Sequence, residues 1–354
     1  MFSCSFVIYL HKQTIAMNSH KAYPQCPGLS FSGLYLLFLV ILFPSTLSAQ
    51  EHIRIVTYNV ENLFDCKDDS LTHDEAFLPT SLRRWSPYRY WDKLHAVSRA
   101  LATIGGDRVP DLVALCEVEN DSVLYDLTRR SPLRTAHYEY LMTSSNDPRG
   151  IDVALLYKPS TFRPFAHRSL RLPTHYLPKG SYVRDMLCVS GVLVTGDTID
   201  LIVCHLPSKL NGQKATRLRR NVVDYMQQAI DSIIRIRAVP HIIVMGDFND
   251  TPNSKALQPL TERLTCITDT LRGSYRYKGH WQQIDHIYLS PTLLDDRQPL
   301  HLSPRRAWLS NDTSLIEPEP LYGGFRPYRT YNGMRYNGGT SDHLPVCFDL
   351  EFEW

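Results

Sequence analysis

Polar side chains recur at the ends of apolar runs in this chain, and their types suit one kind of chemistry. A carboxylate, amide or imidazole at the end of such a run costs free energy unless it is paired or used. These residues are Asn59, Glu117, Asp152, His205, Asp247, Asn249, Asp285, Asp342 and His343. Carboxylates and amides without cysteine ligands suit a hard divalent cation, Mg²⁺ or Mn²⁺. Imidazoles beside them suit acid–base work and phosphate contact, so the set predicts metal-assisted phosphoester hydrolysis.

The apolar runs that carry these residues predict strands. They are rich in Val, Ile, Leu and Tyr and bounded by turn residues, and they lie at 53–60, 111–118, 152–157, 187–194, 199–206, 241–248, 284–289 and 344–352. Steps of three and four predict a helix from Trp91 to Ile104, ended by Gly105 and Gly106, and a second over 218–233. The region 291–339 is weak in periodicity and predicts a long loop excursion. The order indicates a mixed α/β domain with two packed sheets and outer helices.

Two motifs, Gly246-Asp247-Phe248-Asn249 and Ser341-Asp342-His343-Leu344-Pro345, together with Asn59 and Glu117, resemble the endonuclease/exonuclease/phosphatase superfamily. The resemblance runs from Ile53 to about Phe352 in the family's motif order. It implies a four-layer α/β sandwich with two packed, mainly antiparallel mixed sheets and helices outside.

The resemblance also implies roles. Glu117 looks like the main metal-ligand carboxylate and Asn59 like its neighbour. Asp247 looks like the group that orients or deprotonates the attacking water. The remaining site residues are implied to be catalytic: Asn249 as a ligand of the phosphate or nucleophile, His343 as a phosphate contact, Asp342 as the group that orients His343, Asp285 as an acid that orients a histidine or supports the site, and His205. The residues leave open which of the two histidines protonates the leaving oxygen.

Several weaker features adjoin these motifs. Arg149 and Asp152 are expected to bind substrate, although a structural ion pair would also explain Arg149. The cations Lys214, Arg217, Arg219 and Arg220 either meet a phosphate backbone or form a solvated helix face. The aromatic residues Tyr275, Tyr277 and Trp281 either stack on a base or, as we expect, pack in the core.

The first fifty residues differ from the rest. Ten apolar residues from Leu34 to Phe43 precede Ser45–Ala49, which is typical of a cleaved secretory signal and too short to span a bilayer. We expect a signal peptide at 1–49, with a start possible at Met17, an exported single domain at 50–354, and no membrane span in the mature chain.

Composition limits the partners of that mature domain. The 354-residue chain has 38 basic and 36 acidic residues, and loss of Lys12 and Lys21 with the signal leaves 36 of each. A neutral balance argues against strong non-specific affinity for polyanions. No Cys-x-x-Cys pair is present, so a cysteine zinc site is not expected. Export permits a disulfide, with Cys66 and Cys266 as the candidates least associated with strands.

Three functions follow from these observations. The favoured one is a secreted, metal-dependent nuclease that cleaves DNA or RNA phosphodiesters. The second is a phosphatase or phosphodiesterase acting on inositol phosphates or lipid headgroups, similar to a sphingomyelinase. Such an enzyme needs an exposed apolar hairpin; no obvious one is present in the sequence, although 291–339 has room for one. The third, a non-catalytic binding module, predicts decayed site residues, whereas every expected polar position is filled.

Overall fold

The computed structural model describes residues 52–104, 106, 108–209, 212–310 and 312–352. These residues belong to one compact unit, and the expected signal peptide at 1–49 lies outside them. No helix among the described residues is long and apolar enough to cross a membrane.

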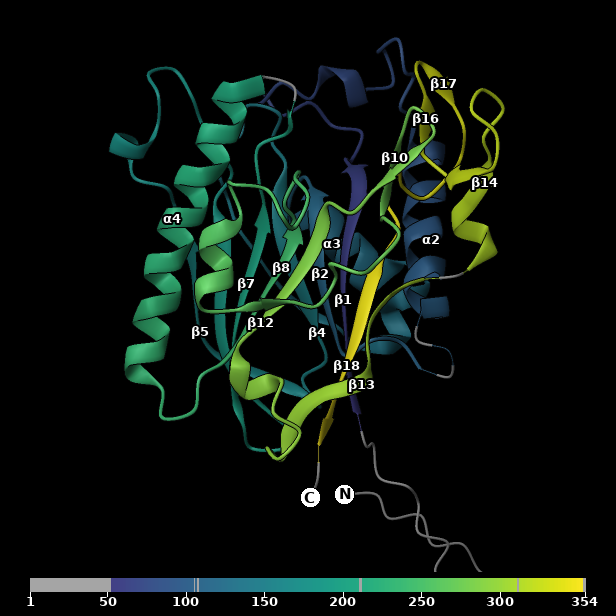
Figure 1. Ribbon diagram of the computed structural model, residues 1–354. Coiled ribbons are helices and arrows are strands. Elements are labelled where there is room, and N and C mark those ends of the chain that lie inside the picture. The colour runs from purple at the N-terminus through teal and green to yellow at the C-terminus, as the bar shows by residue number, and fades with distance from the viewer. Residues whose placement is uncertain (1–51, 105, 107, 210–211, 311, 353–354) are drawn as a thin grey trace, which may run out of the picture. The chain divides into compact units, whose positions relative to one another are not determined.

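Two six-stranded sheets form the centre of the described structure (Figure 1). The first has the order β13-β18-β1-β2-β4-β3, with bounds Leu300–Leu309, Val346–Phe352, His52–Leu63, Leu112–Val118, Asp152–Tyr157 and Glu139–Met142. The second has the order β5-β6-β7-β8-β12-β9, with bounds Phe162–Leu170, Met186–Leu193, Thr198–His205, His241–Asp247, Asp285–Leu289 and Thr265–Cys266. Only β1–β2 and β7–β8 pair in parallel among these described strands. The sheets are therefore mixed and mainly antiparallel, as predicted.

Side-chain alternation along the strands builds the layers. On β1, Ile53 and Ile55 face the second sheet and form the inter-sheet core with residues such as Val203 and Met245. Val56 and Tyr58 point the other way and pack under α2, Pro87–Ile104. The outer face of the second sheet packs in the same manner against α4, Gly212–Ile236. Helix, sheet, sheet and helix thus give the four-layer α/β sandwich that was expected (Figure 1).

The remaining elements are short. They are α3, Asp121–Tyr125; the π-helical turn Asp126–Arg130; the 3₁₀ turns Glu75–Phe77, Pro132–Ala136, Thr174–Tyr176, Gln258–Glu262, Pro291–Leu293 and Thr313–Leu315; and three hairpins, β10–β11 (Tyr275–Tyr277, His280–Gln282), β14–β15 (Ile316–Pro318, Phe325–Pro327) and β16–β17 (Tyr331–Asn332, Arg335–Tyr336).

Two sequence expectations need correction. The region 291–339 is not one long loop, because it contains the edge strand β13 and two of the hairpins. Its pattern is hidden because the pairing of β13 with β18 shifts register between Leu302 and Ala307. The candidate disulfide is also absent: Cys66 and Cys266 are free thiols. They pack in the two outer cores, on opposite sides of the sandwich, and Cys266 lies on strand β9.

Candidate active site

The site residues gather at one edge of both sheets because of strand direction. Parallel strands β7 and β8 end together, with His205 beside Asp247. The antiparallel strand β12 begins at that edge, with Asp285 beside Asp247. In the other sheet, Asn59 lies near the end of β1 beside Cys116. A cavity of about 870 Å³ opens at this edge, and its lining includes Glu117, Asp247, Asn249, Asp342 and His343.

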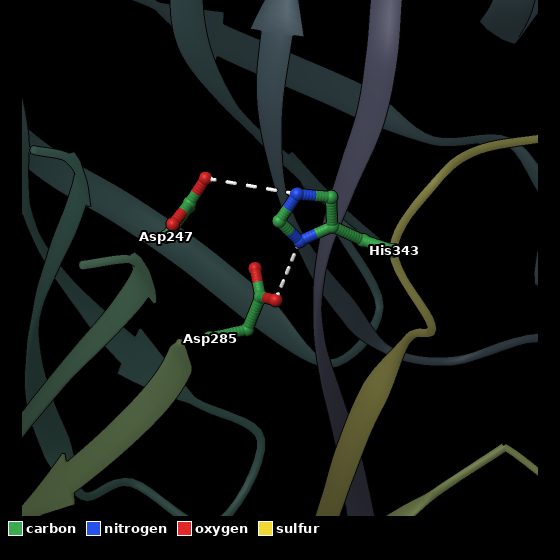
Figure 2. Close-up of side chains that lie close together, drawn as sticks. All are labelled: Asp247, Asp285 and His343. Atoms are coloured by element: carbon green, nitrogen blue, oxygen red, sulfur yellow. Dashed lines mark hydrogen bonds and ion pairs between the residues drawn. The ribbon is translucent and has the colours of Figure 1, made fainter. Parts of the chain in front are cut away.

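His343, which lines the cavity, forms an imidazole–carboxylate pair with Asp285 (Figure 2), and we call this pair together with Asp247 the floor of the cavity. The Nδ1 atom of His343 is 2.7 Å from Oδ2 of Asp285, and the hydroxyl of Ser274 donates to the same oxygen. The Nε2 atom of His343 consequently faces Asp247, whose Oδ2 lies 4.0 Å away. All three side chains are buried. Asp285 therefore fixes the ring and leaves Nε2 as the reactive nitrogen.

Asp342 does not orient His343, contrary to the expectation. Its Oδ2 accepts a 2.6 Å hydrogen bond from Nη2 of Arg329, and its Oδ1 is 3.9 Å from Nε2 of His343, the far side of the ring from Asp285. The backbone explains the difference. The Ser341 hydroxyl accepts from the His343 amide at 3.0 Å and donates to the Asn59 carbonyl at 2.6 Å. This bridge turns His343 inward.

Charge at the floor shifts the pKa values of the pair that faces across it. Burial alone would lower the pKa of His343, but Asp285, Asp247 and Asp342 outweigh it and hold that pKa well above its usual value. Burial, aided by the charge of Asp285, raises the pKa of Asp247 to about 7. The floor thus carries an imidazolium and a carboxyl whose pKa lies near neutral pH, which suits a general base.

A ligand atom of each of Asp247, Asp285 and His343 lies within 4.8 Å of the others, close enough to surround a cation. The 2.7 Å bond between Asp285 and His343 already uses one such atom of each. A cation between them would replace that bond. The arrangement therefore suits acid–base chemistry better than coordination of a cation by these three residues.

Glu117 and Asn59, the two expected metal ligands, lie beside this group. Glu117 lies at a register shift of β2 against β4, with a positive φ of 67°. Such a bulge re-aims a side chain, and the carboxylate reaches the cavity. Its Oε2 accepts from the Asn62 amide at 2.8 Å, and its Oε1 lies 3.2 Å from Nδ2 of Asn59. A partly exposed carboxylate beside an amide fits a hard divalent cation.

The amide of Asn59 also ties Glu117 to the floor. Its Nδ2 donates at 3.0 Å to Oδ2 of Asp247, and its Oδ1 accepts from the Glu61 amide at 3.0 Å. The amide nitrogen, rather than the oxygen, therefore faces the two carboxylates. Asn59 is where the motif predicts it, and its role as a metal ligand stays a prediction.

The turn after β8 depends on a glycine. Gly246 has φ of 145°, and a Cβ there would lie 1.9 Å from the Cys204 carbonyl oxygen. This close approach brings β7 and β8 together directly before Asp247. The amide of Asn249 then donates to Oδ1 of Asp247 at 2.8 Å, and its side chain donates to the Leu206 carbonyl at 3.1 Å. Asn249 itself has a positive φ of 51°, which aims it into the cavity.

His205 lies between Asp247 and Glu117. Its Nε2 is 3.4 Å from Oδ2 of Asp247 and 3.8 Å from Oε1 of Glu117. Burial, with help from the charges of Arg184 and Arg149, lowers its pKa well below the usual value. Its Nδ1 is buried without a partner in the described structure. The lowered pKa favours a neutral His205 whose Nε2 faces the two acids, whereas the pKa of His343 is raised.

Arg184 is a site residue that the sequence reasoning missed. Its guanidinium donates to the carbonyls of His205 and Leu206, each at 3.1 Å, and to Oδ2 of Asp147 at 2.9 Å. It thereby fixes the chain just after β7, where Asn249 also donates. The available signal is weak: a single cation directly before the apolar run of β6.

The two residues expected to bind substrate, Arg149 and Asp152, lie in different surroundings. Arg149 lines the cavity with about half of its side chain exposed, 3.6 Å from Asp147. Asp152 does not line it: its buried carboxylate accepts from the Thr143 hydroxyl and the Ser145 amide. Asp152 therefore supports the start of β4, and nothing in its described surroundings places it against a substrate in the cavity.

The four cations on α4 also lie in different surroundings. Lys214 lines the cavity. Arg219 is buried and pairs with Asp250 at 3.0 Å, and Arg220 pairs with Asp224 one helical turn away. Arg217 is exposed. Only Lys214 of this group is therefore placed to meet a substrate phosphate.

The tyrosines before Asp285 also differ from the expectation. Tyr275 and Tyr277 line the cavity instead of packing in the core, and the Tyr275 ring packs at a tilt against His343, with 4.9 Å between centroids. Trp281 alone packs against the core beneath α2, as expected.

Comparison with known proteins shows the family to which this chain belongs. A sequence model described as the endonuclease/exonuclease/phosphatase family matches residues 54–352, and the chain belongs to that family. Its members hydrolyse phosphoester bonds and depend on divalent metal. No curated protein matches the chain in sequence.

Solved structures share the fold at low identity. An endonuclease/exonuclease/phosphatase family protein from Bacteroides thetaiotaomicron has 17% identity and a TM-score of 0.55, over 85% of this chain and 98% of that one. A mannosyl-6-phosphatase from the same organism has 18% identity and a TM-score of 0.55, over 85% and 100%. The human Nocturnin catalytic domain with bound sulfate anion has 18% identity and a TM-score of 0.54, over 86% and 96%.

Proposed function

We propose that this chain is an exported phosphodiesterase that uses Mg²⁺ or Mn²⁺ to cleave DNA or RNA. One observation carries the choice of substrate: a single cavity combines the catalytic floor with tyrosine and cationic walls. Tyr182, Tyr275 and Tyr277 line it, as do Arg149, Lys209 and Lys214. Tyrosine faces stack on bases, and cations meet phosphates.

The proposed reaction is hydrolysis of one P–O ester bond. The attacking water gives its proton to Asp247, whose pKa of about 7 suits a base near neutral pH. Cationic His343, held by Asp285, gives its Nε2 proton to the leaving oxygen as the P–O bond breaks. His205, whose pKa is lowered, lies beside Asp247 and Glu117 as a neutral imidazole. Glu117 and Asn59 would hold the divalent cation, which offsets the negative charge that develops on the phosphate oxygens.

The charges of the two histidines indicate which of them protonates the leaving oxygen. The pKa of His205 is lowered and that of His343 is raised. Only His343 therefore carries a spare proton at neutral pH, and we assign it, not His205, as the proton donor.

A second candidate function is hydrolysis of a sugar, inositol or lipid-headgroup phosphate. A protein of the same fold is named a mannosyl-6-phosphatase. In addition, the tip of the β14–β15 hairpin exposes Leu321 and Tyr322, the kind of apolar hairpin that a lipid-directed enzyme needs.

A parallel substrate panel separates the two. Purified protein of residues 50–354 is assayed with plasmid DNA, single-stranded DNA, RNA, a hexose 6-phosphate, an inositol phosphate and sphingomyelin, with His343→Ala as the inactive control. Release of nucleotide fragments by the wild type alone supports the proposal. Activity confined to the sugar, inositol or lipid substrates would reject it.

We further propose export through residues 1–49, with 50–354 as the mature single domain. The support is the apolar run ending in small residues before Gln50. N-terminal sequencing of the protein released from expressing cells tests this: residues before Gln50 in the mature chain would contradict cleavage there.

A further inference from the structure

Four large exposed apolar side chains lie on the hairpins β10–β11 and β14–β15, and one of them, Tyr277, lines the cavity. They are Tyr277 at 51% exposed, Leu321 at 75%, Tyr322 at 49% and Phe325 at 55%, and together we call them the aromatic rim. Tyr277 ends β10, and the other three lie in the turn and second strand of the β14–β15 hairpin. Large exposed apolar patches on a folded protein usually mark a binding surface.

The two hairpins that carry the aromatic rim are fastened to each other. The guanidinium of Arg276 donates to the carbonyls of Gly323 and Phe325. Tyr322 lies directly over Gly279, where an added Cβ would come within 2.8 Å of its own Cβ. Figure 1 shows β10 beside the β14 hairpin at the same end of the molecule. The rim is therefore a fixed surface and not a set of independent loop tips.

The aromatic rim is continuous with the active site. Tyr277 belongs both to the rim and to the cavity lining, two residues from Tyr275, whose ring packs against His343. A cation accompanies it, since the Lys278 ammonium lies 5.4 Å from the centroid of the Tyr277 ring. A chain bound at the floor can therefore leave the cavity past Tyr277 and over the β10–β11 turn.

We propose that the aromatic rim is a second binding site, which takes the bases of a single-stranded nucleic acid extending out of the cavity. Exposed rings beside cations are the elements by which proteins hold single strands, with bases stacked on the rings and phosphates facing the cations. A duplex keeps its bases stacked on each other and cannot use such rings. This inference rests on the proposed nuclease function and narrows its substrate to unpaired strands.

A lipid surface is the competing occupant. It would explain Leu321, but not the continuity with Tyr277 and Tyr275 inside the cavity. Three of the four rim residues are aromatic, and aromatic rings bind bases one at a time, whereas insertion in a membrane scales with total buried apolar area. The observations therefore favour the nucleic acid.

The test compares short and long substrates in the presence of Mg²⁺. The values of kcat/KM are measured for the dinucleotide dT2, the strand dT12 and a 12-base-pair duplex, using wild type, Tyr322→Ala, Phe325→Ala and the double variant. Each stacked base contributes about 1–3 kcal/mol. We therefore expect the ratio of dT12 to dT2 to fall about fivefold or more in each single variant, and further in the double variant.

Phe165→Ala is the matched control, because Phe165 is 56% exposed on the edge strand β5, outside the cavity lining. It should leave the ratio unchanged. An unaltered ratio in the double variant, with its melting temperature preserved, overturns the inference while the nuclease function stands. Loss of phosphatidylglycerol-vesicle binding in the double variant, without a change in the ratio, assigns the rim to a lipid instead. Absence of cleavage of every nucleic acid by the wild type rejects the proposed function itself.

Discussion

Asp285 holds His343 by its Nδ1 atom at 2.7 Å and so leaves Nε2 facing Asp247 across the floor of the cavity. Two carboxylates on β8 and β12, paired in register, therefore act on one imidazole from opposite sides. This arrangement keeps the ring both oriented and protonated. The proposed chemistry depends on it more than on any other contact in the described structure.

The first prediction concerns Asp285→Asn and the pH profile. Asparagine keeps the size of the side chain but removes the charge that raises the pKa of His343. The alkaline limb of kcat against pH should therefore move to lower pH in the variant. Asp342→Asn is the matched comparison, since Asp342 bonds Arg329 instead of Nδ1, and it should move the limb less. A limb that stays in place in Asp285→Asn contradicts the account.

The same pair predicts a pH dependence of stability. The pKa of His343 is raised in the folded state, so its contribution is complete below about pH 6.5, the ordinary value. That contribution is lost as the pH rises through the higher folded pKa. Urea unfolding should therefore show a larger cost of Asp285→Asn at pH 6 than at pH 9, by about 1.4 kcal/mol for each unit that the substitution lowers the pKa. An equal cost at both values would show that charge is not the cause.

A third prediction concerns Gly246. In Gly246→Ala the new Cβ would meet the Cys204 carbonyl at 1.9 Å, so β7 and β8 must separate. We expect a loss of about 3 kcal/mol or more in the free energy of unfolding. The control is Gly196→Ala, which has φ of 93° and open space around the added Cβ; it should cost only about 1–2 kcal/mol. Similar costs measured by urea denaturation would refute the close approach of the two strands.

A fourth prediction treats Arg184 as a positioning residue. Arg184→Lys loses the fork that holds the carbonyls of His205 and Leu206, so kcat should fall about tenfold while KM changes little. Arg171→Lys is the control: Arg171 pairs with Asp185, and its side chain is about half exposed. Steady-state kinetics distinguish a positioning residue from a substrate ligand. A raised KM with unchanged kcat would make Arg184 a substrate ligand instead.

Much of the fold was predictable, and the reason is periodicity. The strands that carry the motifs have apolar runs, and both long helices have a clear amphipathic pattern, so the structure confirms them. The strand β13 was missed because its register shift and the sequence Ser303-Pro304-Arg305-Arg306 break alternation. Local patterns predict elements well but do not reveal an edge strand with a bulge.

The site residues, like the strands, were predictable only where the local sequence is distinctive. Motif residues such as Glu117 and His343 could be found, because their types and order are distinctive. The residue that orients His343 was harder to assign: the resemblance implies only that Asp285 orients a histidine or supports the site, and Asp342 is the adjacent candidate, whereas Asp285 is 58 residues away in sequence. Arg184 and the cavity positions of Tyr275 and Tyr277 could not be predicted for the same reason, because only tertiary packing brings these residues to the cavity.

The most direct test of the central claim is a metal titration of activity on single-stranded DNA. Chelator should abolish cleavage by the wild type, and Mg²⁺ or Mn²⁺ should restore it. Glu117→Gln should need a higher metal concentration, and His343→Ala should lose about 10²–10⁴ in kcat at saturating metal. Glu139→Gln, a substitution on the exposed start of β3, should match the wild type. Cleavage that persists in chelator, or full activity in Glu117→Gln and His343→Ala without a shift in metal dependence, would contradict metal-assisted phosphoester hydrolysis at this site.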